Sequence, residues 1–417
     1  MTDTSQLTAN SDSNHHCCKT CSLVVTEVPL EVGQGAYCPR CEQKLYQSKK
    51  GTLSVDLVLA LTCLILFIPT QLFEFVHIRL FGVMISSSLT SGAYDLFEAG
   101  FVALSLLIFF CCSVVPFFVF SSVILSHFAL KINNRILLKL TLFLLRNLKQ
   151  WVTLDVFLVS VAISCFKLKD YADIYFGSGL IAIILLQLMT FLLVIRLDPR
   201  NYWEAIKPSL KSQSTGTMLH CHTCNLLQPI KTKCDRCNSR LYWFKPVSVF
   251  KTWICVIAAA IALIPSNILP ISILLTNGNR LEDTIMSGIF SLINSQMYGI
   301  ALIIFAASIV VPVAKVAGLS YLLLNIQRGS DHEKRLRTKI YLTIKWIGRW
   351  SMMDLFVVAI MITLVDRGQI LDFTPGYGAV AFGIAVVLTM IATESLDPKL
   401  IWLSPPEEKK RELLTNE

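Results

Sequence analysis

Charge is scarce in this chain. Only 16% of its 417 residues are Asp, Glu, Lys or Arg, whereas 54% are hydrophobic and the mean hydropathy is +0.61. A soluble globular domain carries about 25% charged residues, and a disordered chain has few apolar ones. The composition therefore excludes both classes and indicates a polytopic membrane protein.

Motifs of nucleotide hydrolysis and of enzyme catalysis are missing as well. No Gly-x-x-x-x-Gly-Lys-[Ser/Thr] segment occurs, and no soluble stretch is long enough for an ATPase domain. The sequence shows no nucleophile beside a base, no open metal site and no cofactor fingerprint. We therefore expect the chain not to be an enzyme. Any active transport would draw its energy from an ion gradient or from a partner.

The first 50 residues lack the apolar run of a signal peptide. We therefore expect the chain to begin on the side of the membrane where it is made. Lys and Arg are concentrated in the connections at 131–149 and 326–349, whereas 77–97 and 271–295 contain one Arg each. By the positive-inside rule, both termini and the cysteine-rich segments are expected to be cytoplasmic. This topology accounts for the net charge of +9, so no nucleic-acid binding is expected.

What the sequence does have is long apolar stretches. About 17 to 25 apolar residues are needed to cross a bilayer, and eight stretches qualify or nearly qualify. The second and the sixth are longer than a straight crossing requires, so we expect them to tilt or to project from the membrane. The predicted fold is mostly α, with spans near 55–76, 98–130, 150–167, 178–196, 249–270, 296–325, 350–366 and 377–394.

The chain contains two copies of one design. Adding 196 to a residue number carries Cys38 onto Cys234, and after a three-residue insertion adding 199 carries Trp151 onto Trp350. We predict two fused homologous modules, each with a small β ribbon followed by four transmembrane helices. The expected domains are a ribbon over 1–50, a transmembrane module over 51–200, a second ribbon over 201–245, a second module over 246–404 and a charged cytoplasmic tail over 405–417.

Each copy opens with two Cys-x-x-Cys knuckles. Four thiolates form a closed tetrahedral site with no open position for a substrate, and a cytoplasmic location argues against disulfides. We predict two structural zinc ions, with iron as an alternative that uses the same ligands. Cys17 is the alternative to Cys18 as the first ligand. The expected ligands are Cys18, Cys21, Cys38, Cys41, Cys221, Cys224, Cys234 and Cys237.

Polar residues within the spans are few, and we interpret them as a transport network because charge at bilayer depth is expensive. Lys315 lies deep in the sixth span, where we expect an acidic partner, and the first copy has Val119 at its position. This difference favours one asymmetric centre. Lys167 could instead reach the membrane surface, and Asp354 could cap its helix. The predicted network is Lys167, Asp170, Ser308, Lys315, Ser351, Asp354 and Thr389.

The duplicated ribbons, the four spans per copy, the Leu-Asp-Pro segments at 197–199 and 396–398 and the Gly-Arg-Trp-Ser-Met-Met-Asp run at 348–354 resemble the paraquat-inducible protein A family (PqiA/LetA). The resemblance covers nearly the whole chain. It implies a bacterial inner-membrane protein that works with a periplasmic MCE-domain protein, which forms a tube toward the outer membrane. The implied cargo is phospholipid.

Two functional hypotheses follow. In the first, the two modules enclose a periplasm-facing cavity that loads or receives phospholipid, and the polar network couples the shape of this cavity to protonation. In the second, the chain is a membrane anchor, or a redox- or metal-responsive sensor, that does not transport and uses its ribbons to dock a cytoplasmic factor.

Overall fold

In this computed structural model, the described residues lie between 15 and 402. The predicted charged tail over 405–417 and the predicted site residue Asp170 lie outside the described residues. Within the range, the residues left out of the description are 27, 29, 32–33, 48–52, 81–82, 99, 169–172, 207–217, 230, 243, 245–246, 277–278, 330–332 and 366–371.

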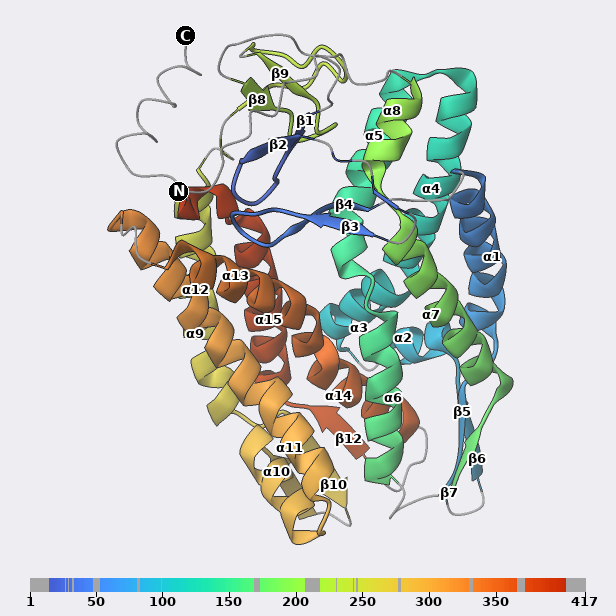
Figure 1. Ribbon diagram of the computed structural model, residues 1–417. Helices are drawn as coiled ribbons and strands as arrows, with labels where there is room; N and C mark the ends of the chain where they lie inside the picture. The colour runs from blue at the N-terminus through green and yellow to red at the C-terminus, as the bar shows by residue number, and fades with distance from the viewer. Residues whose placement is uncertain are drawn as a thin grey trace.

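The described chain has eight helical stretches long and apolar enough to cross a membrane, four in each copy (Figure 1). This confirms the predicted fold class. The stretches are α1 (Leu53–Leu72), α3 and α4 (Val102–Phe109 and Val115–Ile132), α5 and α6 (Arg135–Leu148 and Leu154–Leu168), α7 (Ser178–Arg196), α9 (Ser248–Ile268), α11 and α12 (Tyr298–Phe305 and Val311–Gln327), α13 and α14 (Lys334–Ile347 and Met353–Val365) and α15 (Tyr377–Ser395).

The third and seventh stretches begin well before their predicted starts at 150 and 350. The basic segments predicted as connections form the amphipathic helices α5 and α13, which continue through the 3₁₀ turns η2 (Lys149–Trp151) and η4 (Gly348–Met352). In α5 the buried positions are spaced three and four residues apart, as in a helix with one apolar face. They are Leu138, Thr141, Leu142 and Leu145.

A three-stranded antiparallel sheet lies beside each set of spans, at what we call the sheet end of the molecule (Figure 1). The strand orders β6-β5-β7 and β11-β10-β12 are the same in the two copies, and a short helix follows the second strand of each hairpin. These strands were not predicted, and β5 includes the end of the first predicted span. The elements are β5 (Val76–Leu80), β6 (Val83–Ser87), α2 (Leu89–Glu98), β7 (Asp173–Phe176), β10 (Ser272–Thr276), β11 (Asn279–Asp283), α10 (Ile285–Asn294) and β12 (Asp372–Pro375).

Glycine is required where the last strand of each sheet turns into the following span. A Cβ atom on Gly177 would lie 2.2 Å from the Glu74 carbonyl oxygen, and one on Gly376 would lie 2.0 Å from that of Pro270. No side chain fits there, because another backbone passes at contact distance. The two positions are repeat-equivalent. In both copies, the start of the fourth span therefore packs directly against the backbone that follows the first span.

The second span of each copy contains a π-helical turn, η1 (Phe110–Val114) or η3 (Ala306–Val310). Each turn precedes a proline, Pro116 or Pro312, whose missing N–H frees a carbonyl one turn earlier. In the first copy, Gln71 Nε2 donates to the freed Cys112 carbonyl over 3.5 Å. Single π turns are frequent at functional sites.

The two modules meet through equivalent helices, α6 and α14. The rings of Phe157 and Phe356, which are repeat-equivalent, pack edge to face with centroids 6.0 Å apart. The Ser160 hydroxyl donates to the Met353 carbonyl over 2.9 Å, so a side chain of one module hydrogen-bonds the backbone of the other. This interface contains mainly apolar side chains.

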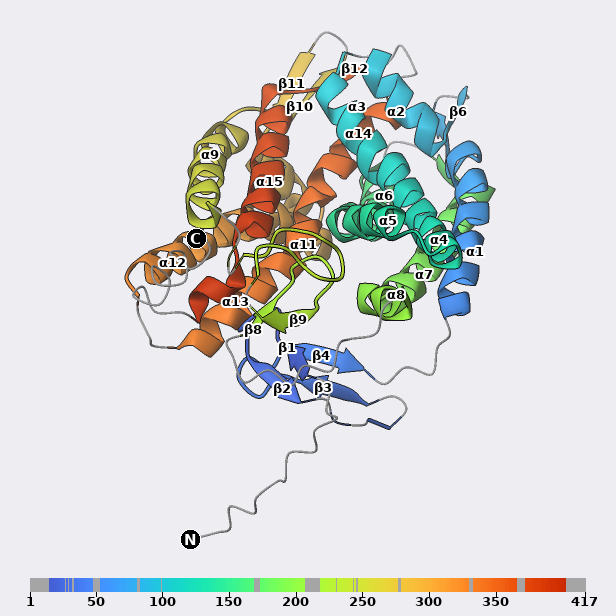
Figure 2. The ribbon, with the colours of Figure 1, turned by 90° about the horizontal axis from the view of Figure 1, so that it is seen from above.

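Two small ribbons lie side by side at the opposite end, which we call the ribbon end (Figure 2). Ribbon 1 contains β1 (His15–Cys17), β2 (Val24–Thr26), β3 (Gly35–Tyr37) and β4 (Lys44–Gln47). Ribbon 2 contains β8 (Met218–His220) and β9 (Leu227–Pro229). Short exit segments, α8 (Pro199–Ile206) and η5 (Pro398–Ile401), follow the two Leu-Asp-Pro sequences.

Candidate functional site

Each ribbon brings its four predicted cysteine ligands together. In each group the four thiol sulfurs lie within 4.8 Å of one another, and all eight residues are buried. In ribbon 1 the Sγ atoms of Cys18 and Cys41 are 3.4 Å apart, and in ribbon 2 those of Cys221 and Cys237 are 3.6 Å apart. Each group is therefore able to hold one metal ion.

The four knuckles share one backbone geometry, which decides between Cys17 and Cys18. In the first knuckle the Cys18 amide donates to the Leu23 carbonyl over 2.8 Å, and the Ser22 amide donates to the Cys18 carbonyl over 3.0 Å. The other three knuckles repeat both bonds from their own first cysteine. The residue after each second cysteine adopts a left-handed conformation, as Ser22 does at φ 57°. Cys17 lies one position outside this pattern.

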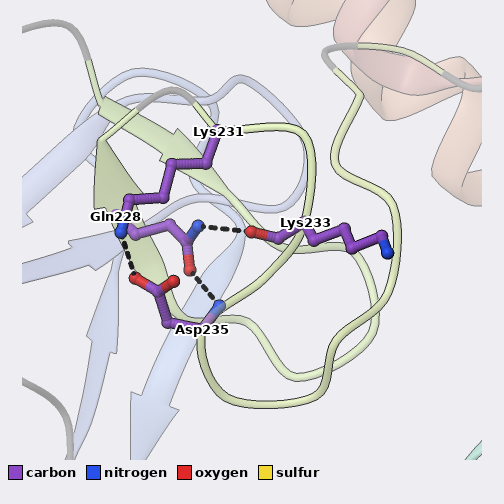
Figure 3. Close-up of polar contacts among 4 residues, drawn as sticks. All are labelled: Gln228, Lys231, Lys233 and Asp235. Carbon is purple, nitrogen blue, oxygen red and sulfur yellow. Dashed lines mark hydrogen bonds and ion pairs between the residues drawn. The ribbon is translucent and has the colours of Figure 1, made fainter.

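Ribbon 2 has only nine residues between its knuckles, and one buried amide spans this connection (Figure 3). Gln228 Nε2 donates to the Lys233 carbonyl over 3.3 Å, and Gln228 Oε1 accepts from the Asp235 amide over 3.1 Å. Lys231 pairs with Asp235 over 2.9 Å. The side chain of Gln228 thereby links the short connection to the second knuckle of ribbon 2.

Both cysteine groups fit a tetrahedral metal ion. Zn–S bonds of about 2.3 Å place tetrahedral sulfurs about 3.8 Å apart, close to the shortest separations seen here. A ribbon of this size has little core of its own, so a bound ion would supply much of its folding energy. Four protein ligands leave no position open for a substrate, so a metal held here would stabilise structure.

Ribbon 1 packs against the second module. Its cysteines share a hydrophobic cluster with α12, α13 and α15. Glu42 pairs with Lys339 of α13 over 2.9 Å, and this hydrogen bond lowers the pKa of the Glu42 carboxyl. The Arg40 guanidinium lies 4.8 Å from the ring centroid of Trp402, a distance typical of cation–π contacts.

Ribbon 2 contacts both modules. Its cysteines belong to the hydrophobic cluster that contains core residues of both modules, and Arg146 of α5 donates to the His222 carbonyl. Each exit segment also sends one basic residue back to the ribbon of its own copy. Arg200 donates to the Leu45 carbonyl over 3.5 Å, and Lys399 Nζ lies 3.1 Å from His220 Nδ1. Both ribbons therefore bridge the two modules.

Four members of the predicted polar network have described side chains, and all four come from the second copy and lie on elements around η4. Lys315 of α12 is 2% exposed, and its Nζ donates to the Gly348 carbonyl over 3.0 Å. That carbonyl follows the last residue of α13, where the helix dipole favours a cation. Ser308 and Ser351 are 1% exposed, and neither hydroxyl has a hydrogen-bond partner in the described part of the chain. Thr389 of α15 bonds its own helix at the Val386 carbonyl.

The remaining predicted members are less well placed. Lys167 lies in α6 and Asp354 in α14, but the description does not extend to their side chains, and Asp170 lies outside the described residues. The partner of Lys315 among the described residues is a carbonyl group, whereas a carboxylate was predicted. The described side chains of the network thus belong to the second module alone.

A small pocket lies between the two modules near the sheet end. Its volume is about 20 Å³, and its lining includes Ser87 and Ser88 from the first copy and Thr363 from the second. A cavity needs about 10 to 15 Å³ by this measure to hold one water molecule. A phospholipid therefore has no room in this pocket as the two modules are arranged here.

Comparison with known proteins identifies the family. The family described as "Paraquat-inducible protein A" matches residues 53–207 and 249–404, one match for each transmembrane module. The chain belongs to this family. The prediction from the duplicated ribbons and the Leu-Asp-Pro segments is thus confirmed.

Bacterial proteins resemble the chain over most of their length. The "Lipophilic envelope-spanning tunnel protein A" of Escherichia coli is 34% identical over 389 residues, which are 92% of this chain and 90% of that protein. The "Probable intermembrane transport protein" of Haemophilus influenzae is 33% identical over 94% of this chain and 96% of its own. The "Intermembrane transport protein PqiA" of Escherichia coli is 29% identical over 96% and 98%. No solved structure matched the chain. The names describe transport proteins rather than enzymes.

Proposed function

We propose that this chain is the integral inner-membrane component of an intermembrane phospholipid transport system. The observation that carries the proposal is the match to two relatives named for intermembrane transport and to one named as an envelope-spanning tunnel protein, which extends over nine-tenths or more of the chain. Eight apolar helices supply the membrane anchorage that such a role requires. As a family member, the chain would pass lipid to, or take it from, a periplasmic MCE-domain tunnel protein.

In this proposal the ribbon end faces the cytoplasm and the sheet end faces the periplasm. The basic helices α5 and α13 lie toward the ribbon end, in agreement with the positive-inside rule. A reducing cytoplasm would keep the eight ligand thiols available for two structural zinc ions, because thiolates are the ligands zinc prefers. The sheet end would then receive the periplasmic partner.

The polar residues around η4 would act as the latch of the transport cycle. The Lys315 ammonium is held by one carbonyl, and the nearby π turn η3 contains Ser308, whose buried hydroxyl lacks a described partner. Buried polar groups that lack partners raise the free energy of the arrangement described here. A second arrangement that satisfies them would therefore lie close to it in free energy. Protonation of Asp354 in α14 would favour one arrangement over the other, and separation of α6 from α14 would enlarge the small pocket at the sheet end.

The test is a lipid-transfer measurement. The chain is reconstituted in vesicles with labelled phospholipid, and the soluble part of the MCE-domain partner is added as acceptor. We expect labelled phospholipid on the acceptor only when the chain is present, and co-purifying phospholipid in mass spectra of the chain isolated without added lipid. Absence of both would favour the anchor or sensor hypothesis, in which changes on the ribbon surfaces alone abolish function.

A further inference from the structure

A groove of about 480 Å³ lies between the two modules where α7 and α15 end, at the ribbon end. Its volume is within the range of ligand sites in proteins. Both modules line it with repeat-equivalent residues: Arg146 corresponds to Lys345, and Val194 corresponds to Thr393. The groove is therefore a feature of the junction between the copies, at the opposite end from the small pocket near the sheets.

The charge of the groove is positive. Arg146, Lys149 and Lys345 line it, against one acid, Glu394. The other lining residues are mostly apolar, so the groove has two more positive than negative charges in mostly apolar surroundings. Attraction between these charges and an anion is stronger there than in water. Arg and Lys in such a setting recognise phosphate groups, Arg through paired N–H donors and Lys as a point charge.

Contacts within the protein hold two of these basic groups in place. The Lys149 ammonium donates to the Val194 carbonyl over 3.0 Å, at the end of α7. The Arg146 guanidinium carries five N–H donors, and one of its nitrogens donates to the His222 carbonyl of ribbon 2. A ligand that contacts Arg146 would therefore contact a residue that also touches a ribbon.

The apolar lining suits acyl chains. Leu145, Leu342 and Met390 border the groove, and Trp346 is 63% exposed beside them. Trp is enriched at the level of lipid headgroups, where its ring is partly apolar and partly wet. A cationic cleft at the ends of membrane-spanning helices, with an apolar wall and an exposed indole, matches an anionic lipid better than a water-soluble metabolite.

We propose that this groove binds an anionic phospholipid, whose phosphate contacts Arg146, Lys149 and Lys345. The site is a different cavity from the small pocket near the sheets, and it borders the proposed latch at Gly348, whose carbonyl accepts from Lys315. The bound lipid would tie the two modules and ribbon 2 together at the membrane surface. Phosphatidylglycerol, with one net negative charge and no ammonium, is the simplest probe.

The experiment is a binding titration by native mass spectrometry of the full-length chain, purified in detergent and stripped of lipid. Phosphatidylglycerol, phosphatidylcholine and inorganic phosphate are added separately. We expect the wild type to prefer phosphatidylglycerol to phosphatidylcholine by about tenfold, equivalent to ~1.4 kcal/mol. The combined change Arg146→Gln, Lys149→Gln and Lys345→Gln should remove this preference. Lys345→Gln alone, which leaves the Arg146 contact with ribbon 2 intact, should reduce it and keep the metal content at the wild-type value.

A matched control removes three positive charges from the same end of the first module but outside the groove: Lys131→Gln, Arg135→Gln and Lys139→Gln. This variant should change the preference less than twofold. Equal losses in the two triple variants, or equal binding of the two lipids by the wild type, would overturn the proposal. Phosphate binding that depends on the same three groove residues and displaces the lipid would identify a site for free anions instead.

Discussion

Two substitutions of Lys315 should separate an effect on protein stability from an effect on lipid transfer. We compare Lys315→Met, which keeps the length of the side chain, with Lys315→Ala, which removes it. The side chain is 2% exposed, so Lys315→Ala should leave a cavity and destabilise the chain by about 2 to 4 kcal/mol. Lys315→Met fills the space. It loses one charge-assisted hydrogen bond to Gly348, which contributes about 1.5 to 3 kcal/mol, but it no longer buries a charge, a penalty of similar size.

The two variants should therefore behave differently in stability and alike in transport. We expect Lys315→Met to unfold within a few degrees of the wild type, Lys315→Ala to unfold clearly earlier, and both to lose lipid transfer. Thermal unfolding followed by tryptophan fluorescence and the vesicle transfer assay measure the two quantities. Lys251→Met, on the exposed surface of α9, removes a charge from the same module and should change neither. Full transfer by Lys315→Met, or equal destabilisation of both variants, would refute the reasoning.

Three further predictions concern the ribbons and the sheet end. Cys221→Ser should lower bound metal from two ions per chain to one by elemental analysis, whereas Cys17→Ser should leave two; a loss with Cys17→Ser would contradict the assigned ligands. Gly376→Ala should reduce the yield of folded protein in size-exclusion chromatography, because its Cβ would overlap a carbonyl oxygen and overpacking costs about 1 to 3 kcal/mol or more; Gly288→Ala, with no atom within 4 Å, should not. The lowered pKa of Glu42 means that its contact stabilises ribbon docking above about pH 4.3 and is lost as the pH falls through the lowered value. Below that pH, the protease resistance of ribbon 1 in the wild type should approach its resistance in Glu42→Gln. A difference between the two proteins that stays constant with pH would argue against this role of Glu42.

Much of the fold could be predicted because its signals are local or periodic. The apolar stretches mark the spans, and the repeated cysteine spacing marks the ribbons. The basic helix α5 was missed as a helix, since its charges masked an apolar face that its three- and four-residue spacing does reveal. The strands of the sheet end were missed because each is only four or five residues long, too short for periodicity to separate from loops.

The candidate site was predicted in part. The sequence identified Lys315 as unusual, but it did not identify the Gly348 carbonyl as its partner, because that contact depends on how α13 ends beside α12. Nor could it predict that Glu42 of ribbon 1 would pair with Lys339, nearly 300 positions later in the chain. The residues of the basic groove were read only as topology signals, since their convergence on one cleft is a property of the assembled modules.

The bridging positions of the ribbons have a consequence for the indivisibility of the chain. Ribbon 1 packs against the second module and also receives Arg200 of the first copy, whereas ribbon 2 contacts Arg146 of the first module and Lys399 of the second copy. Cutting the chain between its copies would give two halves that each carry a ribbon without part of its docking surface. The covalent link makes permanent a partnership in which each half completes the other.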